Sequence, residues 1–375
     1  MQYRPFGNLP KGVSLLGFGA MRLPTSGKPT DIDYDRAKAL VDAAYASGVN
    51  YFDTAYPYHG GASEPFLAKA LAEYPRESYL LATKLPMWKV ESAQDALDTF
   101  EEQLNNLKTD YVDFYLFHAM ETKYVEKLEK LGLWELMDQK RKEGKIRHLG
   151  FSFHDEPEVL EGLCQKWQWD FAQIMYNYID ADFTHGQQQY DILEKHGIPC
   201  IIMEPVRGGR LANLGPAANG VLQKANPTAS IASWAMRWLA PQKNILTILS
   251  GMNALSQLKD NLAVLSDPVP LSPAEEKALA EATEIFKSYS LIGCTGCEYC
   301  MPCPSGVNIP GMIALRNQCA FDANNFSLLQ EYEAFPADKN AGNCTACLAC
   351  EQVCPQHLPI SDIMKKLCED TAVEA

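Results

Sequence analysis

Short runs of apolar residues, each ending near a polar residue, recur through the first two thirds of the chain. Runs of this length with polar boundaries are typical of β-strands that are buried on both faces. Helical patterns at residues 62–73 and 92–107 separate three of the clearest runs. The repeating unit is therefore a strand followed by a helix, with the strands parallel. The three runs are residues 50–55, 79–84 and 111–118.

The same alternation begins before these runs and continues after them. One further helical pattern covers residues 34–47, and a long charged one covers residues 124–143. Eight strand–helix units predict an α/β fold of the closed (β/α)8 type, the TIM barrel. Residues 2–12, with a turn signal at Gly7-Asn8, predict a small hairpin that caps it. The other expected strands are residues 15–20, 146–151, 171–175, 198–203 and 245–249.

Four polar side chains are expected at the C-terminal ends of three consecutive strands, where such barrels carry their functional groups. A free tyrosine has a pKa of about 10, but a nearby cation lowers that pKa. Tyr58 could then protonate a carbonyl oxygen while a hydride reaches the carbon, with Lys84 tuning the phenol. Asp53 would hold Lys84, and His118 would orient the carbonyl. Any one of the four could merely cap a strand, but together they predict a catalytic site.

With these residues in place, the chain resembles the aldo/keto reductase family, whose Asp-Tyr-Lys-His tetrad matches Asp53, Tyr58, Lys84 and His118 in type and order. The phrases at residues 50–55, 58–64 and 150–152 are also similar to family signatures, and the match runs from about residue 3 to about residue 266. The resemblance implies an NAD(P)H-dependent reduction of an aldehyde, ketone or keto-sugar. A G-x-G-x-x-G fingerprint, which would favour a Rossmann domain, does not follow any predicted strand.

The resemblance also implies which residues bind the nicotinamide cofactor. Ser152 and Gln173 correspond to the residues that hold the carboxamide, while Phe153 replaces a further asparagine. Met203 stands where a tyrosine usually stacks on the ring, and a thioether can still pack there. The loop that closes over the pyrophosphate corresponds to Pro205, Val206 and Gly208. The adenosine end would be held at a helix N-terminus, and the matching residues are Ser250, Gly251, Met252, Gln257 and Asn261.

Cofactor preference is expected to be weak. Many family members clamp the 2′-phosphate of NADP with a lysine and an arginine, and those positions correspond here to Leu249 and Gln257. Without a cationic fork the chain should discriminate little between NADP and NAD.

Composition limits the class of protein and its partners. The length of 375 residues exceeds one barrel of about 250 residues by the size of a small domain. A net charge of −14 argues against nucleic acid and anionic membranes as partners. Many enzymes are acidic for solubility alone, which is the alternative explanation of this charge. The start of the chain does not resemble a signal peptide, and no apolar run is long enough to span a membrane. We therefore expect a cytoplasmic protein with reduced cysteines.

Eight of the twelve cysteines fall into two tight clusters near the C-terminus. The second cluster has the full spacing of bacterial two-cluster ferredoxins, and the first departs from it by one residue. The alternative, zinc, needs only two separate cysteine pairs per ion and does not account for overlapping triplets followed by Cys-Pro. The pattern predicts two 4Fe-4S clusters. The expected ligands are Cys294, Cys297, Cys300, Cys303, Cys344, Cys347, Cys350 and Cys354.

The 40 residues between the clusters contain helical patterns at 309–317 and 326–333, so this part is similar to the α-helical type of ferredoxin domain. In two-cluster ferredoxins the fourth cysteine ligates the other cluster. That rule would group Cys294, Cys297 and Cys300 with Cys354, and Cys344, Cys347 and Cys350 with Cys303. The short spacing before Cys303 leaves this grouping open.

The predicted domains are a barrel at 1–268, a linker helix at 269–290 that packs on the barrel, and an iron–sulfur domain at 291–375. One hypothesis is a carbonyl reductase fused to an electron-transfer module, with a small-molecule carbonyl as its substrate and a redox protein as a candidate partner. The alternative is an electron-relay or regulatory subunit whose barrel binds nicotinamide without turnover. A third interpretation makes the clusters purely structural.

Overall fold

The computed structural model describes residues 1–289, 291–321 and 326–371, and their contacts form two compact units. The first unit contains residues 1–206 and 232–271, and the second contains residues 207–231 together with those from 272 onward. This division differs from the predicted one, because residues 207–231 and the expected linker helix group with the C-terminal region rather than with the barrel.

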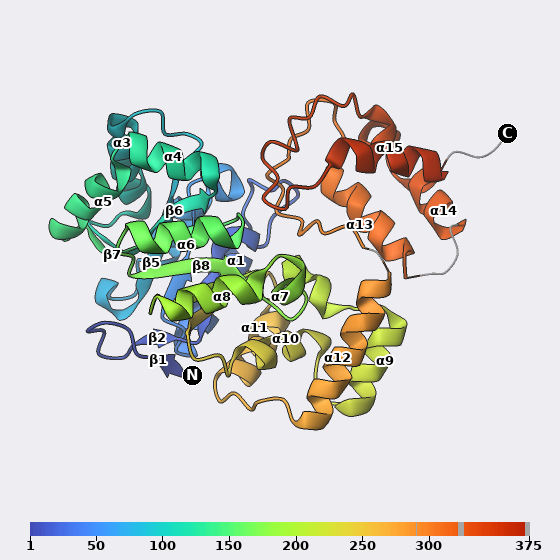
Figure 1. Cartoon of the computed structure of the whole chain (residues 1–375), viewed down its shortest axis with the longest axis horizontal. Coiled ribbons are helices and arrows are strands. Elements are labelled where there is room, and N and C mark those ends of the chain that lie inside the picture. Colours follow the sequence, from blue (N-terminus) through green and yellow to red (C-terminus); the bar gives the residue numbers. More distant parts are fainter. Residues whose placement is uncertain (290, 322–325, 372–375) are drawn as a thin grey trace. The chain divides into compact units, whose positions relative to one another are not determined.

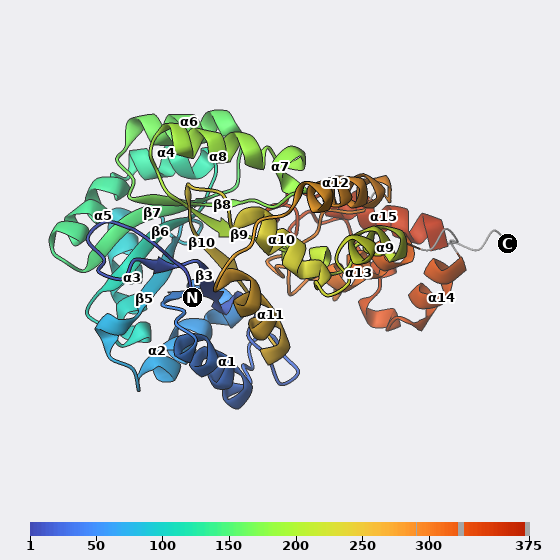
Figure 2. The same cartoon turned by 90° about the horizontal axis from the view of Figure 1, so that it is seen from below.

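The first unit is built on a closed barrel of eight parallel strands, which confirms the predicted fold class. In Figure 2 the strands form the centre of this unit and helices such as α1, α2, α3, α6 and α8 surround them. The small antiparallel hairpin of β1 (Tyr3–Arg4) and β2 (Val13–Ser14) was also predicted. In order around the barrel the strands are β3 (Leu16–Gly19), β4 (Tyr51–Asp53), β5 (Leu80–Pro86), β6 (Val112–Met120), β7 (Ile146–Phe153), β8 (Phe171–Met175), β9 (Cys200–Met203) and β10 (Ile245–Ser250).

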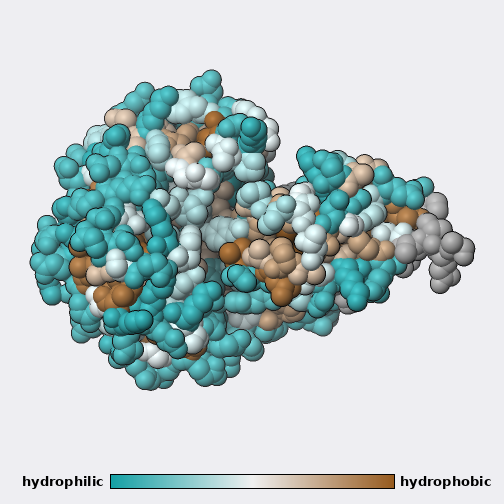
Figure 3. All heavy atoms as spheres, turned by 90° about the horizontal axis from the view of Figure 1, so that it is seen from above, coloured by the Kyte–Doolittle hydropathy of each residue, from teal (hydrophilic) through white to brown (hydrophobic). Residues whose placement is uncertain are grey.

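Two apolar layers hold the barrel together. One fills its interior and includes Tyr51, Phe114 and Phe171, all fully buried. The other lies between strands and helices. On the face drawn in Figure 3 the outer surface of the barrel is mainly hydrophilic. The helices of this unit are α1 (Tyr34–Ala46), α2 (Ser63–Leu71), α3 (Ala93–Leu107), α4 (Thr122–Lys130), α5 (Leu133–Lys142), α6 (Pro157–Lys166), α7 (Asp180–Phe183), α8 (Gly186–Lys195), α10 (Ile231–Leu239) and α11 (Leu255–Leu265).

One predicted helix is wrong in its continuity. The charged stretch at 124–143 forms two helices, α4 and α5, because Gly132 between them has φ +60. That left-handed backbone ends one helix and starts the next, and glycine adopts it without steric penalty.

The second unit is helical. Helix α12 (Pro273–Ser288) lies within the predicted linker helix, and its N-cap Ser272 forms a complete capping box with Glu275. It packs along α9 (Pro216–Ala225), as Figures 1 and 2 both show. Helices α13 (Ile309–Cys319) and α14 (Phe326–Ala334) follow, close to the predicted positions, and α15 (Ile360–Thr371) is a further helix that the sequence analysis did not predict. Their small core includes Met312, Ile313 and Met364. Within the described residues, no helix combines the length and apolarity needed to cross a bilayer.

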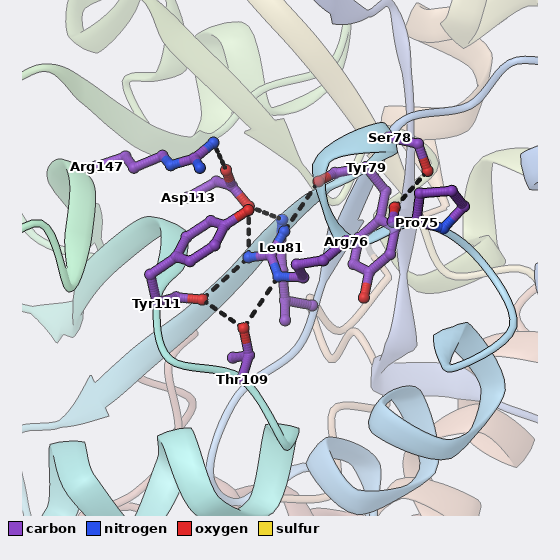
Figure 4. Close-up of polar contacts among 9 residues, drawn as sticks. All are labelled: Pro75, Arg76, Ser78, Tyr79, Leu81, Thr109, Tyr111, Asp113 and Arg147. Carbon is purple, nitrogen blue, oxygen red and sulfur yellow. Dashed lines mark hydrogen bonds and ion pairs between the residues drawn. The ribbon is translucent and has the colours of Figure 1, made fainter.

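A charged network joins the N-terminal ends of three barrel strands (Figure 4). Asp113 on β6 is buried and accepts from Arg76 Nη2 at 2.7 Å, from Arg147 Nη1 at 3.0 Å and from the backbone N–H of Leu81 at 3.0 Å. Both guanidinium groups also pack on the ring of Tyr111, 4.1 and 3.9 Å from its centroid. This end of a barrel generally serves stability rather than catalysis.

We therefore expect Asp113→Ala to lower the free energy of unfolding by about 3 kcal/mol, because it leaves a buried N–H and two cations without their acceptor. The value lies at the low end for buried pairs because Arg76 and Arg147 are 21% and 44% exposed. Urea titration followed by tryptophan fluorescence reports the barrel, since all six tryptophans lie in the first unit. Asp110→Ala, an exposed aspartate nearby, is the control. A loss below about 1 kcal/mol would show that the network is not a stabilising one.

Candidate active site

The first pair of the predicted tetrad forms a direct buried contact. Strands β4 and β5 are parallel neighbours, and they bring Asp53 and Lys84 together inside the barrel. Lys84 Nζ donates to Asp53 Oδ1 at 2.6 Å and to the carbonyl oxygen of Thr54 at 2.7 Å. The two side chains are 1% and 4% exposed. The ammonium group is therefore fixed in place by a carboxylate and a backbone carbonyl.

Burial dominates the electrostatics of this pair. Removal from water lowers the pKa of Lys84 and raises the pKa of Asp53, while their mutual attraction opposes both shifts. A lysine held close to a phenol can lower the pKa of that phenol when it carries its proton.

Tyr58 and His118 complete the tetrad. Tyr58 begins the short helix η2 (Tyr58–Gly61), and Lys84 Nζ lies 5.0 Å from the centre of its ring. His118 is on β6, and the centre of its ring lies 6.1 Å from that of Tyr58. The centre of the Trp88 ring lies 5.0 Å from that of His118. The structure thus brings the four predicted catalytic residues together.

His118 is electrically neutral at neutral pH. Burial first, then the charge of Lys84 and then that of His154, hold the pKa of His118 well below its ordinary value. A neutral imidazole can donate one N–H to a carbonyl oxygen without carrying a charge that would compete with Lys84.

The residues expected to hold the carboxamide are also neighbours. Ser152 on β7 pairs in register with Gln173 on β8, and both are buried. Ser152 Oγ accepts from the backbone N–H of Ala119 at 2.8 Å, so that side chain is oriented. Gln173 Oε1 is buried and makes no hydrogen bond within the described residues. An amide N–H₂ of a nicotinamide carboxamide would satisfy this acceptor, so these residues fit the cofactor.

The other expected cofactor residues follow β9 and β10. Met203 ends β9, with Pro205 and Val206 in the loop beyond it. Ser250 ends β10, and its Oγ accepts from Asn261 Nδ2 of α11 at 2.9 Å. Gln257 Oε1 accepts from the N–H of Asn253 at 2.9 Å. These two side chains therefore shape the loop that leads into α11, in which Met252 is buried.

Two glycines of the expected cofactor loops have packing reasons of their own. A Cβ on Gly251 would lie 3.3 Å from the side chain of Arg22. Gly208 belongs to the second unit, has φ +66, and a Cβ there would come within 2.1 Å of the carbonyl oxygen of Thr295. That close backbone approach within the second unit explains why residue 208 is a glycine.

Leu249 does not occupy the place that the sequence argument gave it. Its side chain lies inside the barrel with Tyr51 and Phe114, and it is 6% exposed. It therefore cannot stand for a phosphate-binding cation, and that part of the prediction is wrong. Strand side chains alternate in direction, so a shift of one position changes which residue faces the interior.

Sequence reasoning missed several polar residues near this site. Arg22 pairs with Glu204 at 3.2 Å across the ends of β3 and β9, and Glu204 has φ +53. Glu64 is buried at 1% exposure behind Lys84 and bonds to α3. Gln103 and Asn106 are three residues apart, so they lie on the same face of that helix. This spacing of two polar residues could have indicated that they bind one buried polar group.

In the second unit the eight cysteines of the two motifs form two groups. One hollow is lined by four cysteines from both motifs, Cys303, Cys344, Cys347 and Cys350. A second hollow is lined by Cys294, Cys297, Cys300 and Cys354. Burial raises the pKa of Cys300 to about 12, with Cys297, Cys294 and also Cys354 adding to the shift. The grouping is the one expected for crossed ligation of two clusters, so these thiols fit two iron–sulfur clusters.

Comparison with known proteins finds a family match for each of the two parts of the chain. Residues 15–284 match the aldo/keto reductase family, and residues 293–359 match a 4Fe-4S dicluster domain. L-galactose dehydrogenase of Arabidopsis thaliana is 27% identical over 76% of this chain and 95% of its own length. The NADH-specific methylglyoxal reductase of Escherichia coli (strain K12) is 24% identical over 76% of this chain and all of its own length.

Among solved structures, the holo form of an aldo-keto reductase from Bacillus halodurans superposes with a TM-score of 0.62. It is 24% identical and covers 75% of this chain and 96% of its own. Because the family match covers residues 15–284, more than half of the chain, the protein belongs to the aldo/keto reductase family and is an NAD(P)-dependent oxidoreductase with a C-terminal 4Fe-4S dicluster domain.

Proposed function

We propose that the protein reduces a small carbonyl compound, an aldehyde, ketone or keto-sugar, with NADH or NADPH. The observation that supports this is the buried Asp53–Lys84 pair with Tyr58 and His118 beside it. Relatives whose names describe a sugar dehydrogenase and a methylglyoxal reductase point to the same chemistry.

When bound, a reduced nicotinamide would supply the hydride that the carbonyl carbon receives. Tyr58 gives its hydroxyl proton to the carbonyl oxygen, so the products are an alcohol and the oxidised cofactor. Lys84 stabilises the phenolate that remains, and Asp53 keeps Lys84 in place. His118 donates a hydrogen bond to the oxygen as negative charge develops there. Gln173 and Ser152 would orient the carboxamide.

Cofactor preference follows from the same residues. Leu249 has no part in this preference, because its side chain lies inside the barrel. Gln257 Oε1 accepts a hydrogen bond from the N–H of Asn253. With an amide rather than a cation at that position, NAD should be accepted about as well as NADP. A relative named as NADH-specific supports use of NADH.

The eight cysteines would hold two 4Fe-4S clusters in the two hollows. Gly296 N–H donates to Cys294 Sγ at 3.4 Å. Hydrogen bonds to ligand sulfurs are among the features that set the reduction potential of a cluster. Nicotinamide gives up an electron pair as hydride, whereas a cluster takes one electron at a time. The sequence carries no flavin signature that would split the pair, so we assign the clusters to a separate electron route or to stability of their unit.

Tyr58→Phe should lower carbonyl reduction by about 10²–10⁴-fold, because the proton donor is lost. Cofactor binding, measured by titration of NADPH fluorescence, should change less than about threefold, or roughly 0.7 kcal/mol. The assay follows nicotinamide oxidation against a panel of aldehydes, ketones and keto-sugars.

Tyr56→Phe, two residues earlier and bonded to Glu102 at the surface, is the matched control and should retain full activity. If Tyr58→Phe stays within tenfold of the parent, Tyr58 is not the donor. If the parent turns over no member of the panel, the electron-relay or regulatory alternative gains support.

The pH dependence of kcat/KM should show no loss of activity near pH 6.5, the ordinary pKa of histidine. The pKa of His118 lies well below that value, so the imidazole stays neutral as the pH falls through 6.5, and protonation sets in only at lower pH. We expect kcat/KM to change less than about twofold from pH 8 to pH 6. An inflection at about 6.5 that disappears in His118→Gln would show that His118 titrates normally.

Replacing Cys347 by Ser in the full chain should reduce its iron content and visible absorbance, because this thiol lines one of the hollows. Carbonyl reduction should stay within about twofold of the parent rate if hydride transfer does not need the clusters. Cys368→Ser, in the same unit but outside both hollows, controls for loss of a thiol. Loss of activity while the protein stays folded by circular dichroism would instead put the clusters on the catalytic path.

A further inference from the structure

A second carboxylate lies buried behind the catalytic lysine. Side chains alternate along β5, so Lys84 faces Asp53 inside the barrel while Thr83 faces the helices outside. On that side Thr83 Oγ1 donates to Glu64 Oε1 at 2.6 Å. Glu64 is on α2, six residues after Tyr58, and is 1% exposed. The strand that carries Lys84 thus separates two buried acids.

Helix α3 completes the surroundings of Glu64. Gln103 Nε2 donates to Glu64 Oε1 at 2.9 Å and also to the backbone carbonyl of Lys84 at 2.9 Å. Asn106 Nδ2 donates to Glu64 Oε2 at 3.1 Å. Tyr115 OH donates to Gln103 Oε1 at 2.8 Å, which fixes the direction of the Gln103 amide. One side chain therefore links the Glu64 carboxylate to the main chain of Lys84.

The hydrogen bonds around Glu64 suit a charged carboxylate. Thr83, Gln103 and Asn106 all donate to it, so it acts only as an acceptor, as an ionised carboxylate must. Burial raises the pKa of Glu64, and these three hydrogen bonds oppose that shift. The charge of Glu64 in turn favours the protonated form of Lys84, whose pKa burial lowers.

We infer that Glu64 is a positioning residue for the reaction: from behind the strand, its charge keeps Lys84 protonated and its hydrogen-bond network fixes the Lys84 backbone. Asp53 holds the ammonium group itself, while Glu64 sets the field in which that group and Tyr58 titrate. This inference rests on the proposed function, in which Tyr58 must stay protonated until it gives its proton to the carbonyl.

The test is Glu64→Gln in the full chain. Loss of a negative charge lowers the pKa of every neighbouring group, so the basic limb of the kcat/KM profile for carbonyl reduction should move to lower pH by about 0.5–1 unit. A purely structural role would lower stability without moving this limb. Glu73→Gln, an exposed glutamate near the end of the same helix, should leave the limb where it is. A limb unmoved in Glu64→Gln overturns the inference.

Two double variants keep the test decisive if Glu64→Gln does not fold, since its new amide would face the amide of Asn106. Glu64→Gln/Asn106→Asp moves the charge across one hydrogen bond, and Glu64→Gln/Asn106→Leu removes both the charge and the clash. The first should lie close to the parent, and the second should show the lowered limb. Equal limbs in the two would overturn the inference.

A readout without turnover separates this inference from the proposed function. With lysine labelled at ¹³Cε and assigned by Lys84→Arg, NMR titration should give a lower midpoint for Lys84 in the Leu double variant than in the Asp one. If the parent reduces no carbonyl yet the midpoints differ, the proposed function fails and with it the role of Glu64 in the reaction, while the electrostatic link between Glu64 and Lys84 stands. Equal midpoints overturn the inference even if the enzyme is active.

Discussion

The structure of the site depends on one contact, the buried ion pair between Lys84 and Asp53 at 2.6 Å. Taking two such charges out of water costs several kcal/mol per ion, so the pair persists only with close geometry and further hydrogen bonds. The carbonyl of Thr54 supplies one of these at the ammonium group. A hydrophobic pair would fill this space at lower cost, so the charged pair fits the proposed action of Lys84 on Tyr58, whose ring centre lies 5.0 Å from Lys84 Nζ.

The position of that pair follows from features that a sequence displays. Strands buried on both faces must be continuously apolar, which makes residues 79–84 and 111–118 recognisable, and parallel strands end at one rim. Asp53, Lys84 and His118 could therefore be predicted to meet. The network around Glu64 could not, because Glu64, Gln103 and Asn106 lie on helices α2 and α3, where no rule of the barrel places polar side chains together. Which polar side chains share one buried site is a property of packing.

Errors of the sequence argument have equally local causes. Whether Leu249 faces the barrel interior depends on strand register, and a slip of one residue reverses it. The break at Gly132 depends on a single left-handed backbone position inside an otherwise helical charge pattern. The cysteine motifs were easier to interpret, since their spacing alone restricts the chemistry.

The path of the chain ties the two units together in a way that a linear domain scheme does not express. After β9 the chain leaves the barrel unit at Val206, builds α9, and returns at Ala232. Helix α9 finds its partner in α12, and Asn226 Nδ2 at its end donates to Glu275 Oε1 at 3.0 Å. A cut before Ser272 would expose the face of α9 that buries Ala218 and Leu222. The barrel is thus not a module to which an iron–sulfur domain was simply appended, because a segment between two of its own strands is needed to complete the other unit.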